Sequence, residues 1–234
     1  TVRFWDLRYF ADPRDAVRDA SSPFRPDGVV INGAAAEREI LESGFLREGV
    51  VGAEALRFLH LNAFSFSPTP HKGTDSSGLR LLVLGDYSRS GTAKMMRMLE
   101  QAAVAFPPGL CCTVKPHPSS PINPAEYPGI AFKLDNAPVG SLIAGHDLAF
   151  CSNKSGAAID AYLAGLITLV MLDDCDLNLS PLRGRQDICF VDSSVELVKA
   201  LLAGYGPTRS ETREKIDLFY LDPALPRWTQ LLTS

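Results

Sequence analysis

Short hydrophobic runs alternate with amphipathic stretches over most of the chain, most regularly between residues 79 and 203. A short apolar run is typical of a buried strand, and apolar residues spaced three or four apart predict a helix with one buried face. The expected strands are 79–84, 111–114, 130–134, 148–151, 167–172 and 188–191, and the expected helices are 92–105, 139–144, 156–164 and 195–203. Strands that alternate with helices predict an α/β fold in which a parallel sheet carries helices on both faces.

A shorter α/β pattern precedes the regular one. Residues 29–33 and 50–56 have the pattern of strands, and residues 34–43 have that of a helix. The composition changes to Ser, Thr, Pro and Gly at 65–78, which is typical of a linker. The expected parts are an incomplete first α/β domain (1–64), the linker (65–78), the main α/β domain (79–207) and a helical tail that packs back (208–234). Because the chain begins at Thr1 without an initiator methionine, we expect it to be a piece of a longer protein.

The composition is that of an ordinary globular protein and excludes several functions. Of the 234 residues, 46% are hydrophobic and 21% are charged. A net charge of −4 without a dense basic cluster argues against nucleic-acid binding. The five cysteines have neither metal-ligand nor disulfide spacing, so we expect reduced thiols in the cytoplasm and no metal site. No apolar run approaches the roughly 20 residues that a membrane-spanning helix needs.

The polar loop Cys151–Gly156 lies between a predicted strand and a predicted helix. Ser152, Asn153 and Ser155 supply hydrogen-bond donors, and Gly156 lets backbone N–H groups approach a ligand closely. The positive end of the helix dipole would lie at the same place, which favours an anion site. The alternative is that Ser155 only caps the helix and that Ser152 and Asn153 cover the end of the strand.

A second candidate is the segment Lys115–Pro118, K-P-H-P, which also follows a predicted strand. Its two prolines end the strand and fix the backbone around His117. Open α/β sheets bind ligands at the carboxyl ends of their strands. His117, with Lys115 and Pro118 beside it, is therefore a better candidate for an anion contact than the other three histidines.

Further polar loops should open on the same edge. Asp86 ends a predicted strand and is placed to hold a hydroxyl group, and Gly91 and Thr92 either offer backbone N–H groups to a diphosphate or sugar or form part of a helix cap. The cluster 173–176, D-D-C-D, suggests a divalent metal ion, but carboxylates after a strand more often cap, face solvent or hydrogen-bond a sugar. The sequence has no hydrolase nucleophile motif, Walker A motif or dinucleotide fingerprint, so it identifies no catalytic residue.

Several of these segments together resemble one known family. They are K-P-H-P after a strand, S-N-x-S with A-A-x-D-A-Y-L-A-G-L, a V-M-L-D strand followed by L-N-x-S-P-L-R-G, and the opening T-V-R-F-W-D-L-R-Y-F. The family belongs to bacterial surface-carbohydrate biosynthesis, in O-antigen or capsule assembly, and resembles GT-B glycosyltransferases. The resemblance implies a GT-B-like fold, with a Rossmann-type sheet flanked by helices and part of a second α/β domain. Bacterial sialyltransferases and capsule Kdo transferases share the H-P motif, which contacts the nucleotide of a CMP-sugar there.

The resemblance also implies roles for particular residues. His117 and Pro118 would touch the nucleotide, and Ser152, Asn153 and Ser155 would bind phosphate at the helix start. Residues 79–207 would then form the nucleotide-sugar-binding domain, and the full catalytic site would include parts outside this chain.

The function implied is that of a glycosyltransferase whose donor is a nucleotide-activated sugar, with a CMP-sugar favoured over a UDP-sugar. Its acceptor would be a glycan or a lipid-linked glycan, and it would need no further cofactor. A sugar-nucleotide 2-epimerase and a non-catalytic GT-B-like scaffold are the alternatives. The resemblance implies a bacterial cytoplasmic location and leaves open a peripheral association with the inner face of the membrane.

Overall fold

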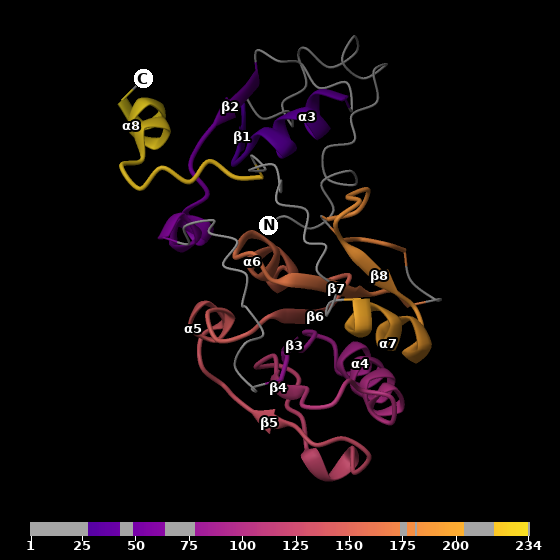
Figure 1. The fold of residues 1–234 in the computed structure, drawn as a ribbon. Helices are drawn as coiled ribbons and strands as arrows, with labels where there is room; N and C mark the ends of the chain where they lie inside the picture. The colour runs from indigo at the N-terminus through magenta and orange to yellow at the C-terminus, as the bar shows by residue number, and fades with distance from the viewer. Residues whose placement is uncertain are drawn as a thin grey trace. The chain divides into compact units, whose positions relative to one another are not determined.

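The structure is a computed structural model of the chain. It describes residues 28–42, 49–63, 78–173, 177–180, 182–203 and 218–233. The chain forms two compact units: the described residues from 78 to 203 belong to the larger one, and those from 28 to 63 and from 218 to 233 to the smaller one. Each unit has its own parallel sheet (Figure 1).

The sheet of the larger unit has six strands in the order β5-β4-β3-β6-β7-β8 (Figure 1). The strands are β3 (Arg80–Leu84), β4 (Cys111–Lys115), β5 (Lys133–Leu134), β6 (Leu148–Ser152), β7 (Ile167–Met171) and β8 (Cys189–Val191). Every neighbouring pair is parallel, which confirms the predicted α/β fold. The chain enters the sheet at β3, builds outward to β5, and then returns beside β3 with β6. This is the strand order of doubly wound sheets, and their ligands bind where the order reverses, here between β3 and β6.

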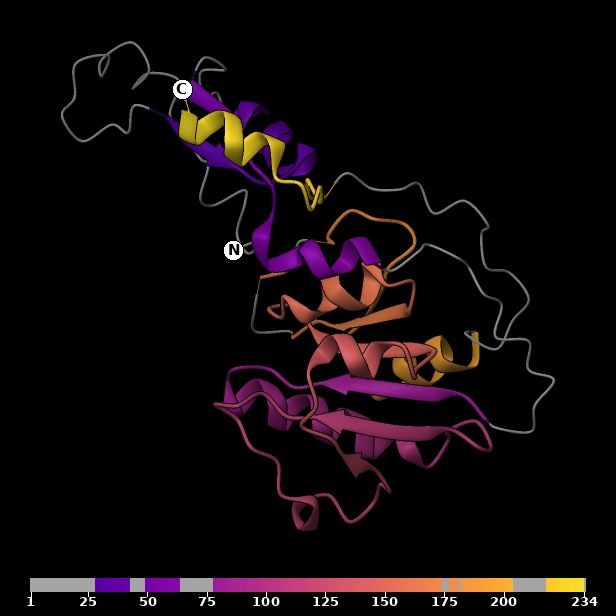
Figure 2. The same cartoon turned by 90° about the vertical axis from the view of Figure 1, so that its left-hand side faces the viewer.

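Helices cover both faces of this sheet. They are α4 (Arg89–Ala103) and α7 (Ser194–Ala203) on one face and α5 (Val139–Ile143) and α6 (Ala157–Leu163) on the other (Figures 1 and 2). Because successive side chains of a strand point to opposite faces, Leu81 and Val83 of β3 pack into the core beneath α4 while Leu82 and Leu84 face the other way. All four are at most 2% exposed, as the unbroken apolar run predicted.

Two boundaries differ from the predicted ones for a physical reason. Helix α4 begins at Arg89, before the predicted start at residue 92, because the Ser88 side chain caps it. Strand β5 covers only two residues because Ile130, predicted to be part of it, donates its N–H to the Tyr127 carbonyl and packs into the core instead. The loss of strand pairing here shortens an outer strand and leaves the centre of the sheet unchanged.

The smaller unit combines two distant parts of the chain. Its elements are the parallel strands β1 (Val29–Ile31) and β2 (Val50–Gly52), helix α3 (Ala34–Glu42), the 3-10 helix η2 (Leu56–Ala63) and helix α8 (Pro226–Thr233). Tyr220 donates its N–H to the carbonyl of Asn32 and accepts from the N–H of Ala55, both at 2.9 Å. The rings of Phe58 and Phe219 stack with centroids 4.2 Å apart. The C-terminal residues are therefore an integral part of this unit.

Glu54 fastens helix α8 to the end of β2. Its buried carboxylate accepts hydrogen bonds from the backbone N–H groups of Arg227 and Trp228, both at 3.1 Å, in the first turn of the helix. The Trp228 indole N–H donates to the Glu54 carbonyl at 2.9 Å. Burial raises the pKa of Glu54, but the hydrogen bonds from Arg227 and Trp228 outweigh it and hold the pKa below its ordinary value of 4.5. Ionised Glu54 therefore stabilises the smaller unit.

We expect Glu54→Gln to lower the stability of the protein at neutral pH, because a hydrogen bond to a charged group is worth roughly 1.5–3 kcal/mol. The folded state lowers the pKa, so this stabilisation is complete above about pH 4.5 and is lost as the pH falls through the folded-state pKa. Thermal unfolding followed by tryptophan fluorescence from pH 7 to pH 3 should show the variant and the wild type converging in acid. Glu42→Gln, at an exposed glutamate of α3, is the control and should unfold like the wild type. A constant difference between Glu54→Gln and the wild type at all pH values would contradict this account.

Candidate functional site

Asp86 lies just beyond the end of β3, where the strand order of the large sheet reverses. It is 2% exposed, and its two carboxylate oxygens have different partners. Oδ1 accepts the backbone N–H of Ser88 at 2.9 Å, and Oδ2 accepts the hydroxyl of Ser152 at the end of β6 in a very short contact. A buried carboxylate with hydrogen bonds to both oxygens is well compensated for its loss of water. Asp86 thus joins the two strands that flank the reversal.

Gly91 and Thr92 in the first turn of α4 pack directly on Asp86. The Thr92 hydroxyl donates to the Asp86 carbonyl at 2.8 Å. A Cβ on Gly91 would lie 3.2 Å from both Cγ and Oδ2 of Asp86, a tight contact that would require a small shift of the carboxylate. The sequence suggested the backbone N–H groups of Gly91 and Thr92 for a ligand or for a helix cap. Both groups bond to Ser88. The Gly91 N–H donates to the Ser88 hydroxyl at 3.3 Å, and the Thr92 N–H donates to the Ser88 carbonyl at 2.9 Å. The first of these bonds caps the helix, and the second is its first backbone hydrogen bond.

The loop after β6 directs most of its polar groups inward. Ser152, Asn153 and Ser155 are all at most 9% exposed. The Asn153 side-chain amide donates to the Leu177 carbonyl at 3.0 Å, and its backbone N–H donates to the Met171 carbonyl at 3.1 Å. These two bonds tie the loop to the end of β7 and to the segment that follows it. The loop is therefore held in one shape by contacts to its neighbours on the sheet edge.

The sequence left open whether Ser155 caps helix α6, and the structure shows a different start. Gly156 is the N-cap residue, with φ −66° and ψ −21°, and has no side-chain cap. The Ser155 hydroxyl instead accepts the N–H of Ala157 at 3.3 Å, and the Ser155 N–H donates to the Ser152 carbonyl at 3.1 Å. The backbone N–H of Ser155 therefore has a partner, whereas the backbone N–H of Gly156 has none among the described residues.

The K-P-H-P segment forms a tight turn at the end of β4. The Ser120 N–H donates to the His117 carbonyl at 2.8 Å, which closes a four-residue turn with Pro118 in its second position. Lys115, the last residue of β4, accepts the N–H of Gly85 at 3.0 Å through its carbonyl, and its ammonium group donates to a backbone carbonyl at 3.4 Å. His117 and Pro118 are exposed on this turn. The sequence-predicted histidine is therefore held at the carboxyl edge and open to solvent.

The loop after β3 has contacts with both neighbouring loops. Through Asp86 it reaches Ser152 after β6, and through the carbonyl of Tyr87 it accepts the hydroxyl of Ser119 after β4 at 2.8 Å. The predicted residues on these three loops thus share one edge of the sheet. Ser119 and Ser88 are the members that sequence reasoning did not select; for Ser88, its place just before a helix start was a usable signal.

The loop after β7 is drawn to the same edge by an ion pair between Lys94 of α4 and Asp173. The other members of the acidic cluster, residues 174–176, lie outside the described residues. Among the residues that the structure describes, no group of His, Cys, Asp or Glu side chains is arranged to hold a metal ion. Of the suggested metal site, the structure describes only Asp173, which pairs with Lys94.

The buried thiols of the sheet are not placed for nucleophilic chemistry. Burial raises the pKa of Cys112 to about 12, with a smaller contribution from Cys111. Burial also raises the pKa of Cys151, which is fully enclosed in β6, and the charge of Asp160 adds to this. A thiol held neutral is a poor nucleophile, so both behave as core residues.

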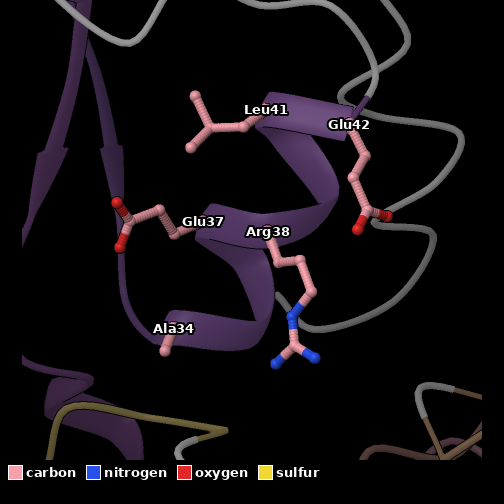
Figure 3. A pocket seen from close by; sticks show the side chains of 5 residues that line it. All are labelled: Ala34, Glu37, Arg38, Leu41 and Glu42. Atoms are coloured by element: carbon pink, nitrogen blue, oxygen red, sulfur yellow. The ribbon is translucent and has the colours of Figure 1, made fainter.

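A hollow lies along α3 in the smaller unit, lined by Ala34, Glu37, Arg38, Leu41 and Glu42 (Figure 3). Glu37 points toward the strands while Arg38 and Glu42 point away from them (Figure 3). The Glu37 carboxylate accepts the hydroxyl of Tyr220 at 3.1 Å. Because its walls come from one helix and its charged groups diverge, this hollow is a weaker candidate than the sheet edge.

No known protein-family model and no curated protein sequence matches this chain. Among solved structures, it is similar to UDP-GlcNAc 2-epimerase from Methanocaldococcus jannaschii in complex with UDP-GlcNAc and UDP, with a TM-score of 0.61 at 11% identity. That match covers 88% of this chain, which spans 61% of the epimerase. A weaker match is KpsC, a β-Kdo 2,7 transferase from Thermosulfurimonas dismutans, with a TM-score of 0.40 at 12% identity, over 82% of this chain and 78% of that one. The epimerase match supports the predicted GT-B-like fold. Within the described part of the chain, no helix is long and apolar enough to span a membrane.

We expect Asp86→Ala to destabilise the larger unit by about 3 kcal/mol or more, because it removes two hydrogen bonds to a buried charge. Asp192→Ala, which alters an exposed aspartate after β8, should change stability by no more than about 0.5 kcal/mol. Urea unfolding of both variants measures the difference. Equal stability of the two variants would mean that the Asp86 bonds do not hold the site together.

Proposed function

We propose that this chain is the donor-binding part of a glycosyltransferase that uses a nucleotide-activated sugar in bacterial surface-polysaccharide assembly. The observation that carries the proposal is the position of His117: an exposed imidazole on a hydrogen-bonded turn after β4, the strand next to β3. Ligands of doubly wound sheets bind where the strand order reverses, and β3 is one of the two strands at that place. The likeness of the fold to an enzyme that binds UDP-GlcNAc and UDP supports a nucleotide-sugar as the ligand.

The charges at the edge suit a phosphate group. Lys115 ends β4 and Lys154 belongs to the β6 loop, on either side of the β3 loop, and the N–H of Gly156 at the start of α6 has no partner among the described residues. The other polar groups of the β6 loop hold the loop in shape. We therefore assign direct contact to His117, to the two lysines and to the Gly156 N–H, and we give Asp86, Ser152 and Asn153 the role of fixing the loops around the ligand.

The chemistry that this arrangement supports is stabilisation of a leaving nucleotide. When the bond from the sugar to the phosphate breaks, negative charge accumulates on the phosphate oxygens. Fixed donors and cations at that place lower the energy of the transition state without having to reorganise. The H-P motif favours a CMP-sugar over a UDP-sugar. The acceptor, a glycan or lipid-linked glycan, and the remaining catalytic groups would be bound by parts of the protein beyond these loops.

A sugar-nucleotide 2-epimerase is the second candidate, and the structural likeness to UDP-GlcNAc 2-epimerase favours it. An epimerase would bind a UDP-sugar without needing an acceptor. Incubating the full-length protein with CMP- and UDP-sugars, with and without an acceptor glycan, separates the two reactions. Release of free nucleotide that depends on acceptor supports the transferase. A change in sugar configuration without acceptor supports the epimerase, and nucleotide binding without turnover supports a non-catalytic scaffold.

We expect His117→Ala to weaken nucleotide binding about ten- to a hundredfold, because a hydrogen bond between imidazole and a charged phosphate is worth roughly 1.5–3 kcal/mol. The melting temperature should stay near that of the wild type, because the side chain is exposed. Titration calorimetry with CMP and UDP measures the effect, and His60→Ala, at an exposed histidine of the smaller unit, is the control. Unchanged binding of both nucleotides would remove His117 from the site.

The start of α6 can be tested without removing a polar side chain. The backbone of Gly156 has φ and ψ that any residue adopts, so Gly156→Val should fold while its side chain crowds the approach to the N–H. We expect reduced nucleotide affinity at a near-native melting temperature. Gly145→Val is the matched control before β6, where a Cβ would make an ordinary contact at 3.6 Å. If Gly156→Val binds nucleotide as well as Gly145→Val does, the β6 loop is only a structural helix start.

A further inference from the structure

We propose that Ser119 is a positioning residue for His117, holding its imidazole so that Nε2 is the ring nitrogen that faces the ligand. The inference rests on the proposed function for the identity of that ligand, a nucleotide phosphate. It goes beyond that function in assigning a role to Ser119 and an orientation to the His117 ring.

The first observation is that Ser119 contacts the histidine ring twice. Its backbone N–H donates to His117 Nδ1 at 3.2 Å, and its hydroxyl oxygen lies 2.7 Å from the same nitrogen. Both contacts go to the same ring nitrogen, so Nδ1 is occupied within the turn. Nε2 is the remaining polar group of the ring.

The second observation is that the Ser119 hydroxyl is itself anchored. It donates to the backbone carbonyl of Tyr87 at 2.8 Å, 32 residues earlier in the chain, on the loop that also contains Asp86. The histidine is thereby linked through one serine to the loop at which the strand order reverses. Without this contact, an imidazole on an exposed turn would rotate about its side-chain bonds. A fixed ring loses less conformational freedom when a ligand binds.

The alternative is that Ser119 only shapes the turn. The turn has its own closing bond, from the Ser120 N–H to the His117 carbonyl, and Pro118 fixes its second residue. Neither feature needs the Ser119 hydroxyl. Ser119→Ala should therefore keep the turn and release the ring, and Ser119→Thr, which retains a hydroxyl, should restore it.

The test uses protein labelled with ¹⁵N and ¹³C in histidine, first without ligand. Carbon relaxation should show a rigid ring in the wild type and in Ser119→Thr and a mobile ring in Ser119→Ala. Ser141→Ala, which removes another hydroxyl that donates to a backbone carbonyl, should leave the ring rigid. A ring that is equally rigid in Ser119→Ala overturns the inference.

Nucleotide titrations of the same variants separate this inference from the proposed function. CMP or UDP should bind about two- to tenfold more weakly to Ser119→Ala, the range expected for one neutral hydrogen bond, and Ser119→Thr should bind as the wild type does. If His117→Ala lowers the affinity and Ser119→Ala does not, the positioning role is overturned while the proposed function stands. If the ring is mobile in Ser119→Ala but neither His117→Ala nor Ser119→Ala changes the affinity, the proposed function fails. The structural link from Ser119 to His117 then remains.

Discussion

The hydrogen bond between the Asp86 carboxylate and the Ser152 hydroxyl is the contact on which the arrangement of the candidate site depends. A parallel sheet by itself fixes the positions of strand ends but leaves the loops beyond them free to diverge. Asp86 comes from β3 and Ser152 from β6, the two strands between which the order of the sheet reverses. Their bond, buried from water, closes the base of the site. Gly91 then brings the first turn of α4 against the same carboxylate.

The buried polar groups of the loops after β3 and β6 form hydrogen bonds within the protein. The reason is that a buried donor or acceptor without a partner costs free energy. The groups that we propose for a ligand are the exposed His117 ring and the Gly156 N–H, which has no partner among the described residues. A site of this kind is fixed in shape before ligand binds, which reduces the ordering cost of binding.

The sequence predicted the sheet well because a central parallel strand must be apolar on both faces, and such runs are easily recognised at 81–84 and 148–151. It also placed His117 and Asp86 at strand ends. It could not predict that Asp86 bonds to Ser152, since that depends on which strands are neighbours, and the two residues are 66 positions apart. The sequence left open whether Gly91 serves a ligand or a helix cap; in the structure its N–H bonds to the Ser88 hydroxyl. The sequence also could not predict that β5 is short, because this follows from the packing of Ile130 in the core and not from the local pattern of apolar residues.

The central claim is that a nucleotide binds at the carboxyl edge of the larger sheet. An NMR titration of the ¹⁵N-labelled protein with CMP and with UDP tests it most directly, because backbone amide shifts locate a ligand whatever its orientation. The account predicts that the largest shift changes fall in residues 85–92, 116–120 and 153–156, and that they saturate together. Changes that instead centre on α3 in the smaller unit, or no saturable change with either nucleotide, would contradict it.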